Sequence, residues 1–160
     1  MKRLVSISLV SLLAMSMLAI ASCKKEKTCK NQDPALEETV IQEYITKQGL
    51  TVTKHPKGLY YQILNAGGPT KPNMNSVVYV TYKGTLLDGT VFDSQSNPGR
   101  TGFILANLIE AWRIGIPMMG KGGSMKMVLP SALGYGCNGS GETIPENAPL
   151  YFEIALVDFF

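Results

Sequence analysis

Two glycine-rich segments have the spacing of nucleotide-binding loops. Residues 115–123 read GIPMMGKGG, which departs from the pattern G-x-x-x-x-G-K-[ST] only at its last position, and residues 134–139 read GYGCNG, which fits G-x-G-x-x-G. Both patterns bind phosphates only where a strand precedes the loop and a helix follows it. Here the first segment leaves an expected helix and enters an expected strand, and Pro145 and Pro149 follow the second segment. We therefore expect these glycines to form turns between strands, and we expect no cofactor.

Other reactive side chains are few. His55 is the single histidine and lies beside Pro56 in a polar stretch, which argues against a Ser/His/Asp or Cys/His nucleophilic site. The three cysteines, Cys23, Cys29 and Cys137, lack the spacing of zinc ligands. Cys29 and Cys137 could pair in an oxidising compartment, but they come from regions with no obvious reason to meet. We expect no metal site.

The N-terminus has the layout of a signal peptide. A basic start, MKR, precedes an apolar run that ends at Cys23. The sequence LAIASC resembles a bacterial lipobox, which implies cleavage before Cys23 and lipid on its sulfur; a transmembrane anchor or a plain signal peptide with an incidental cysteine are the alternatives. Removing residues 1–22 lowers the formal net charge from +3 to +1, because Lys2 and Arg3 leave with no acidic residue. No basic field for nucleic acid remains. We predict a lipid-anchored protein of the bacterial cell envelope, with Lys24 favouring the outer membrane, facing the periplasm.

The next residues predict a tether and a helix. Residues 23–34 are expected to be the lipidated tether and residues 35–57 a helical extension of the domain at 58–160. The helix is expected over Ala35–Gln48, where Gly49 follows as a stop signal. Its apolar stripe consists of Leu36, Val40, Ile41, Tyr44 and Ile45. We expect this stripe to dock on the domain or, alternatively, to pair with a second copy.

The rest of the chain has the period of β-strands. Val78, Val80 and Tyr82 share one face of an expected strand, and DG at 88–89 is a hairpin turn signal. The expected strands are 58–64, 76–87, 90–94, 103–105, 124–130 and 150–160.

One late segment has a helical period instead. Residues 107–115, NLIEAWRIG, are expected to form a short helix with Asn107 as its N-cap and Gly115 at its end. Its apolar face needs cover, so we expect it to lie in the concave side of a curved sheet. The fold class is therefore α+β: a curved antiparallel sheet wrapped around one short helix, preceded by an N-terminal amphipathic helix.

Four linked segments, from roughly Ser76 to Phe160, resemble the FKBP-type peptidyl-prolyl cis-trans isomerases. They are VYVTYKGTLLDGTVFDSQ, LIEAW, MVLPSALGYG and IPENAPLYFEIALV. The family fold, an antiparallel sheet over a short helix, agrees with the pattern of strands. The helix and strand that precede these segments are similar to the N-terminal extensions of envelope-anchored members.

The resemblance implies a proline-binding pocket. Its implied members are Tyr82, Phe92, Asp93, Leu108, Ile109, Trp112, Tyr135, Ile144 and Phe152. In the family pattern Trp112 resembles the floor, while the walls are Tyr82, Phe92 and Phe152. The Ile109 N–H and the Tyr135 hydroxyl resemble the donors to substrate carbonyls, and Asp93 resembles the carboxylate at the pocket edge. Taken singly, Tyr82, Trp112, Ile144 and Phe152 could belong to a core, and Asp93 could cap a turn.

Three positions depart from the family pattern. Thr101 stands where the family often has an aromatic wall, and Ser140 and Thr143 replace residues that are commonly larger. We expect these changes to shift affinity and sequence preference more than to abolish activity.

The function implied is isomerisation of X–Pro bonds in envelope proteins, which assists their folding. The implied partners are proline-containing polypeptides, rapamycin- or tacrolimus-type ligands, and a membrane through Cys23, without nucleic acid. Two alternatives stay open: a non-catalytic binding module for proline-containing partners, which Thr101 keeps open, and a membrane-surface chaperone acting through the Ala35–Gln48 helix. The sequence leaves the oligomeric state open.

Overall fold

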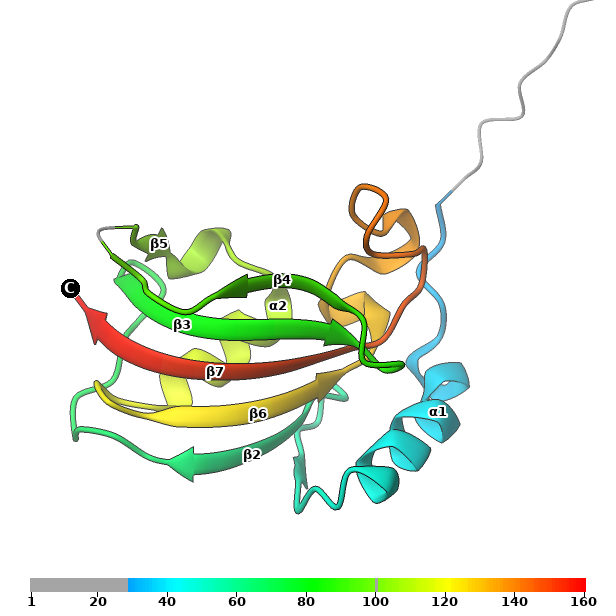
Figure 1. Cartoon of the computed structure of the whole chain (residues 1–160), viewed down its shortest axis with the longest axis horizontal. Helices are drawn as coiled ribbons and strands as arrows, with labels where there is room; N and C mark the ends of the chain where they lie inside the picture. The colour runs from blue at the N-terminus through cyan, green and yellow to red at the C-terminus, as the bar shows by residue number, and fades with distance from the viewer. Residues whose placement is uncertain (1–28, 100) are drawn as a thin grey trace, which may run out of the picture.

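The computed structural model describes residues 29–99 and 101–160, which form two helices, one sheet and several short 3-10 turns (Figure 1). The predictions for the signal peptide and Cys23 lie outside these residues. The helices are α1 (Pro34–Lys47) and α2 (Glu110–Gly115). The strands are β1 (Thr53–Lys54), β2 (Tyr60–Asn65), β3 (Val77–Leu86), β4 (Val91–Gln95), β5 (Phe103–Ile104), β6 (Ser124–Leu129) and β7 (Leu150–Phe159).

The sheet has the order β1-β2-β6-β7-β3-β4, with β5 also pairing with β3, and every pair is antiparallel. Figure 1 shows the curved sheet with α2 lying across one face and α1 beside one end. The predicted architecture, a curved antiparallel sheet around one short helix with a further helix in front, is confirmed.

The main core fills the space between the sheet and α2. Its alternating residues from β6 and β7 are the ones that the period-2 pattern predicts: Met125, Met127, Leu129, Leu150, Phe152, Ile154 and Leu156. Gly115 packs against this layer, since a Cβ added there would lie 2.6 Å from the Met127 sulfur. The glycine that was expected to stop α2 therefore also lets the helix approach β6, and the chain continues into a 3-10 turn at Ile116–Met118.

A second core lies on the opposite face of the sheet, under α1. Ile41, Tyr44 and Ile45 of the helix bury themselves against Tyr60, Val128 and Tyr151. The strand residues Val128 and Tyr151 are register partners on β6 and β7. These two strands are therefore covered on both faces at this end. Consecutive residues are buried there, whereas more and less buried residues alternate along the remainder of each strand.

The docked face of α1 differs from the predicted stripe. Ile41, Tyr44 and Ile45 are buried as expected, but Leu36 is 67% exposed and Val40 is 49% exposed. Glu37 is instead only 4% exposed. The helix is rotated toward this carboxylate because Glu37 accepts two hydrogen bonds from the domain, which the apolar pattern does not encode.

The short helix begins later than predicted. Asn107 does not cap it; residues 105–107 form a 3-10 turn, and α2 starts at Glu110 after an extended Leu108. The turn is held from outside, because Leu105 N donates to Ser76 O and Ala106 N donates to Met74 O, both at 3.0 Å. These long-range bonds prevail over the local capping signal.

The first glycine-rich segment leads from α2 into β6, so it leaves a helix and enters a strand as the sequence predicts. Gly120 N donates to Ala66 O at 2.9 Å, and Gly68 N donates to Lys121 O at 2.9 Å. A Cβ at Gly120 would lie 2.7 Å from the carbonyl oxygen of Thr70. The glycine is needed for the close approach of two backbone segments, and no helix follows it to hold a phosphate.

Candidate functional site

A cavity of about 160 Å³ opens between α2 and the concave face of the sheet. Its lining comes from β3, β4, β5, the segment before α2, α2 itself, the loop after β6, and β7. The lining residues are Tyr82, Asp93, Phe103, Leu108, Ile109, Trp112, Tyr135 and Phe152. Apart from one carboxylate and two tyrosine hydroxyls, their side chains are hydrophobic.

Trp112 lies at the centre of the aromatic packing. Its ring meets Tyr82 edge-on with centroids 5.0 Å apart, and it meets Phe152 edge-on at 5.4 Å. Both contacts have the edge-to-face geometry that aromatic pairs favour. Because Trp112 is only 5% exposed and held from two sides, its ring is a rigid surface.

Phe92 extends this packing from β4. Its ring lies edge-on to Phe152, with centroids 5.5 Å apart. Gly84 on β3 makes room for the pair, since a Cβ there would lie 2.5 Å from the Phe92 ring and 2.7 Å from the Phe152 ring. A larger residue at Gly84 would push both rings away from their places.

Tyr82 and Asp93 form a polar pair at the cavity. The Tyr82 hydroxyl donates to Asp93 Oδ2 at 2.6 Å. Burial, together with this hydrogen bond and the negative charge of Asp93, raises the pKa of Tyr82 well above its usual value. Tyr82 therefore stays a neutral donor, and Asp93 is held in one orientation.

Two further donors line the cavity. Burial, followed by the charge of Asp93, raises the pKa of the Tyr135 hydroxyl, so this group keeps its proton. The Ile109 N–H makes no hydrogen bond within residues 29–99 and 101–160. The Ile109 carbonyl instead begins α2 by accepting from Trp112 N at 3.0 Å and Arg113 N at 3.2 Å. These two hydrogen bonds to the Ile109 carbonyl fix the backbone at Ile109, and with it the direction of the unpaired Ile109 N–H.

The structure brings most of the predicted site residues to the cavity. Those that line it are Tyr82, Asp93, Leu108, Ile109, Trp112, Tyr135 and Phe152. Phe92 and Ile144 do not line it: Phe92 packs on Phe152, and Ile144 is 5% exposed within the main core.

One residue that lines the cavity was not predicted from the sequence, and Thr101, where the family often has an aromatic wall, does not line the cavity. Phe103 lines the cavity from β5, where it pairs with Val78. The apolar run FIL at 103–105 was its only signal in the sequence. Thr101, two residues earlier, is exposed and does not line the cavity.

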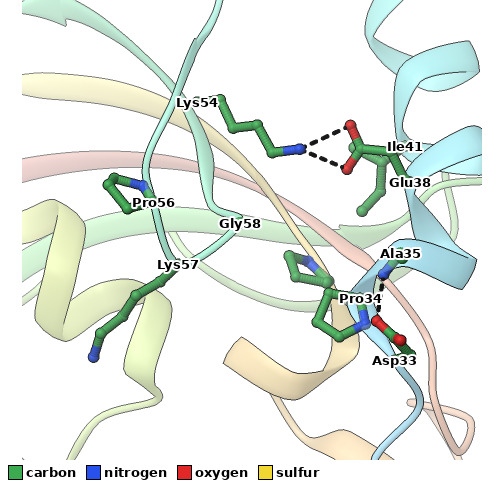
Figure 2. A pocket seen from close by; sticks show the side chains of 10 residues that line it. Asp33, Pro34, Ala35, Glu38, Ile41, Lys54, Pro56, Lys57 and Gly58 are labelled. Carbon is green, nitrogen blue, oxygen red and sulfur yellow. Dashed lines mark hydrogen bonds and ion pairs between the residues drawn. The ribbon is translucent and has the colours of Figure 1, made fainter.

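A larger cavity of about 430 Å³ lies between α1 and residues 54–58 (Figure 2). Its charged side chains already have partners. Lys54 Nζ lies 3.0 Å from both carboxylate oxygens of Glu38, and Lys57 Nζ lies 2.5 Å from Glu110 Oε1. The Tyr60 hydroxyl also donates to Glu38 and, with Lys54, lowers the pKa of that carboxyl. Because these charges satisfy one another, the smaller aromatic cavity is the better candidate site.

Two further features were sought in the part of the chain that the structure describes. None of its helices combines the length and apolar character that crossing a bilayer requires. No three His, Cys, Asp or Glu side chains in this part gather closely enough to hold a metal ion.

Comparison with known proteins identifies related sequences. A family model described as FKBP-type peptidyl-prolyl cis-trans isomerase matches residues 68–157. The chain is 35% identical over 135 residues to a probable FKBP-type peptidyl-prolyl cis-trans isomerase FkpA of Neisseria meningitidis, covering 84% of this chain and 49% of the relative. It is 37% identical over 113 residues to the outer membrane protein MIP of Legionella longbeachae, covering 70% of this chain and 48% of the relative. The chain thus spans about half the length of the curated relatives it matches.

A solved structure shares the fold. The crystal structure of FkpA from Escherichia coli superposes with a TM-score of 0.69 and 37% sequence identity. The match covers 79% of this chain and 61% of that one. Every residue that lines the aromatic cavity falls within the range of the family model.

Proposed function

The chain belongs to the FKBP-type peptidyl-prolyl cis-trans isomerase family, and from this premise we propose that it catalyses cis–trans exchange of X–Pro peptide bonds at the cavity around Trp112. The observation that carries the proposal is the composition of this cavity. It combines a small aromatic interior with neutral donors at Tyr135 and Ile109. An apolar interior and well-placed neutral donors can both favour the twisted amide over the planar one.

The reaction needs no nucleophile, metal or acid–base pair. The isomers of an X–Pro bond differ by only about 0.5–1 kcal/mol, but amide resonance sets a barrier of about 18–20 kcal/mol between them. In the twisted amide this resonance is lost and the carbonyl is less polar. An apolar cavity therefore disfavours the planar ground state more than the twisted state, and only such differential binding raises the rate.

In this proposal Trp112 supports the proline ring, and Tyr82, Phe103 and Phe152 enclose it. The Tyr135 hydroxyl and the Ile109 N–H donate to carbonyl oxygens of the substrate. A donor aimed where the rotated carbonyl arrives stabilises the transition state more than the ground state, and each ~1.4 kcal/mol of such a difference gives a tenfold faster rate. Asp93 orients Tyr82 and gives the cavity edge a negative charge.

The further proposal is that the protein acts in the bacterial envelope, anchored by lipid on Cys23. The signal-like N-terminus supports this, as does the name of the Legionella relative, an outer membrane protein. Disulfides persist in oxidising compartments, and the structure contains one between Cys29 and Cys137. Five residues lie between Cys23 and Cys29, so even a fully extended tether would keep Cys29 within about 20 Å of the membrane surface. Its substrates would then be proline-containing envelope proteins.

Peptide exchange tests the activity. The full chain, purified in mild detergent, would be added in catalytic amounts to an X–Pro tetrapeptide, and exchange would be followed by NMR without a coupling protease. We expect wild type to accelerate exchange and Tyr82→Ala to lose most of that acceleration. Thr81→Ala is the matched control, because the neighbouring side chain on β3 points to the opposite face of the sheet and does not line the cavity.

The outcomes separate the alternatives. Tight peptide binding without accelerated exchange would favour a binding module. Acceleration that survives in Tyr82→Ala would refute this site. A chaperone acting through the stripe of α1 is a weaker candidate, because Ile41, Tyr44 and Ile45 are already buried against the domain.

A further inference from the structure

The N-terminal segment Cys29–Glu37 lies along the loop that carries Tyr135. This loop, residues 130–149, connects β6 to β7. Figure 1 shows the segment, in blue, passing beside the loop, in orange, before it enters α1. The sequence predicted a free tether up to residue 34, but the described residues 29–33 are bound to this loop at several points.

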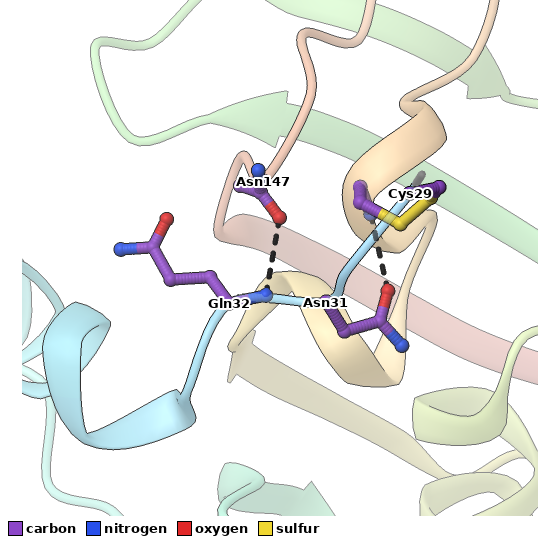
Figure 3. Close-up of a disulfide and its surroundings, with 5 residues drawn as sticks. Cys29, Asn31, Gln32 and Asn147 are labelled. Atoms are coloured by element: carbon purple, nitrogen blue, oxygen red, sulfur yellow. Dashed lines mark hydrogen bonds between the residues drawn. A yellow bond between two sulfur atoms is a disulfide. The ribbon is translucent and has the colours of Figure 1, made fainter. Parts of the chain in front are cut away.

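The first attachment is covalent. Cys29 and Cys137, which have no evident reason to meet in the sequence, form a disulfide with their Cα atoms 5.5 Å apart and 108 residues of separation (Figure 3). Two hydrogen bonds flank it. Cys137 N donates to Asn31 Oδ1 at 3.2 Å, and Gln32 N donates to Asn147 Oδ1 at 3.2 Å. Asn147 N in turn donates to Gly136 O at 2.8 Å, so both sides of the loop are tied together.

The second attachment is a buried carboxylate. Glu37 Oε2 accepts from Ser131 N at 2.7 Å, and Glu37 Oε1 accepts from the Ser131 hydroxyl at 2.6 Å. Glu37 is 4% exposed and Ser131 is fully buried. A carboxylate in such a place is costly unless it is hydrogen-bonded, and losing it would leave the buried Ser131 N–H unpaired.

The attachments lie on both sides of Tyr135. Ser131 precedes Tyr135 by four residues and Cys137 follows it by two. Between them, Gly136 has φ +56°, and a Cβ there would collide with the Asn31 side chain. The N-terminal segment therefore contacts the residue that directly follows Tyr135.

We propose that Glu37 and the Cys29–Cys137 disulfide are positioning groups for the reaction, which hold the Tyr135 hydroxyl where it meets the substrate carbonyl. This inference rests on the proposed isomerase function and assigns part of the site to residues outside the matched family range of 68–157. A displacement of a catalytic group by about 1 Å can lower the rate up to about a hundredfold. Anchors at Ser131 and Cys137, a few residues to either side of Tyr135, therefore determine how well the Tyr135 hydroxyl stabilises the transition state.

The test measures kcat and KM separately on the full chain. We expect Glu37→Ala to lower kcat about tenfold with KM nearly unchanged, because a donor acting in the transition state is lost and ground-state binding is not. Glu37→Gln is the rescue: its amide oxygen can accept from Ser131 N while its NH2 donates to the Ser131 hydroxyl. Cys29→Ala/Cys137→Ala should lower kcat in the same way.

The matched control is Glu38→Gln. Glu38 is the next carboxylate on α1, and it binds Lys54 and Tyr60 and not the loop. We expect it to leave kcat unchanged, so a loss specific to Glu37 is not general damage to the extension.

A double-mutant cycle shows whether the effect passes through Tyr135. In a Tyr135→Phe background, Glu37→Ala should cost no further activity, because the donor that it positions is already absent. Additive losses, or a wild-type kcat in Glu37→Ala, would overturn the inference while leaving the isomerase function intact.

Hydrogen exchange provides a readout that needs no catalysis. The amides of residues 132–137 should exchange faster in Glu37→Ala and in the double cysteine variant than in wild type and Glu38→Gln. If wild type shows no isomerase activity, the proposed function fails; unchanged exchange in these amides would separately refute the anchoring.

Discussion

At the scale of residues, the cavity depends on rings that hold one another at right angles. Tyr82 and Phe152 meet Trp112 edge-on, and Phe92 meets Phe152 in the same way. Phe92 does not line the cavity, yet it fixes the orientation of a residue that does. Loss of Phe92 should therefore affect the rate through Phe152.

Phe92→Ala is the variant that tests this chain of contacts. We expect kcat/KM to fall about tenfold, equivalent to ~1.4 kcal/mol of transition-state stabilisation, and the free energy of unfolding to fall by about 2 kcal/mol for the partly buried ring. Val91→Ala, at an exposed neighbour on β4, should change neither quantity measurably. Peptide exchange and urea unfolding measure the two effects. Equal kinetics in the two variants would mean that Phe152 does not depend on Phe92.

The protonation of the two tyrosines predicts the pH profile. Burial is the main cause that raises the pKa of both Tyr82 and Tyr135, and the charge of Asp93 acts in the same direction. Both hydroxyls thus keep their protons as the pH rises to their ordinary pKa of 10.0. We expect kcat/KM to stay constant between pH 7 and about 9.5. A fall with a midpoint near pH 8, absent in Tyr135→Phe, would show that the tyrosine loses its proton early.

At the scale of elements, α2 and β3 place the site while α1 covers the opposite face of the sheet. The period-2 patterns of β3, β6 and β7 were predictable because each strand buries one face in the main core. The start of α2 was not, because Ser76 and Met74 bind the preceding turn and displace the Asn107 signal. The face of α1 was only partly predictable, since the apolar stripe includes Leu36 and Val40 but the docked face includes Glu37.

The docking of α1 yields a stability prediction. Ile41 is 1% exposed in the second core, so Ile41→Ala should lower the free energy of unfolding by about 2–5 kcal/mol. Val40→Ala, at the adjacent exposed position, should change it by less than about 0.5 kcal/mol. Urea unfolding of both variants gives the comparison. If the two variants unfold alike, α1 is not docked through this face.

At the scale of the whole molecule, a disulfide and several hydrogen bonds join the N-terminal segment to the FKBP-type domain. The resemblance to the family predicted seven of the eight residues that line the cavity, because they lie on elements that the family pattern contains; it missed Phe103, and the predicted Phe92 and Ile144 do not line the cavity. The Cys29–Cys137 disulfide could not be predicted in this way. Its partners are 108 residues apart, and Cys29 precedes the range that the family model matches. Only the position of the segment along the loop brings the two cysteines together.

We propose that exchange is catalysed in the cavity around Trp112. Rapamycin titrated into the full chain during X–Pro peptide exchange measures this directly, with binding followed in parallel by Trp112 fluorescence, since the chain has a single tryptophan. We predict that the catalysed rate falls to the uncatalysed rate as the binding signal saturates, in the same stoichiometric range. Catalysis that continues at full strength after the fluorescence change is complete would contradict the claim, because the cavity would be filled and the activity would reside elsewhere.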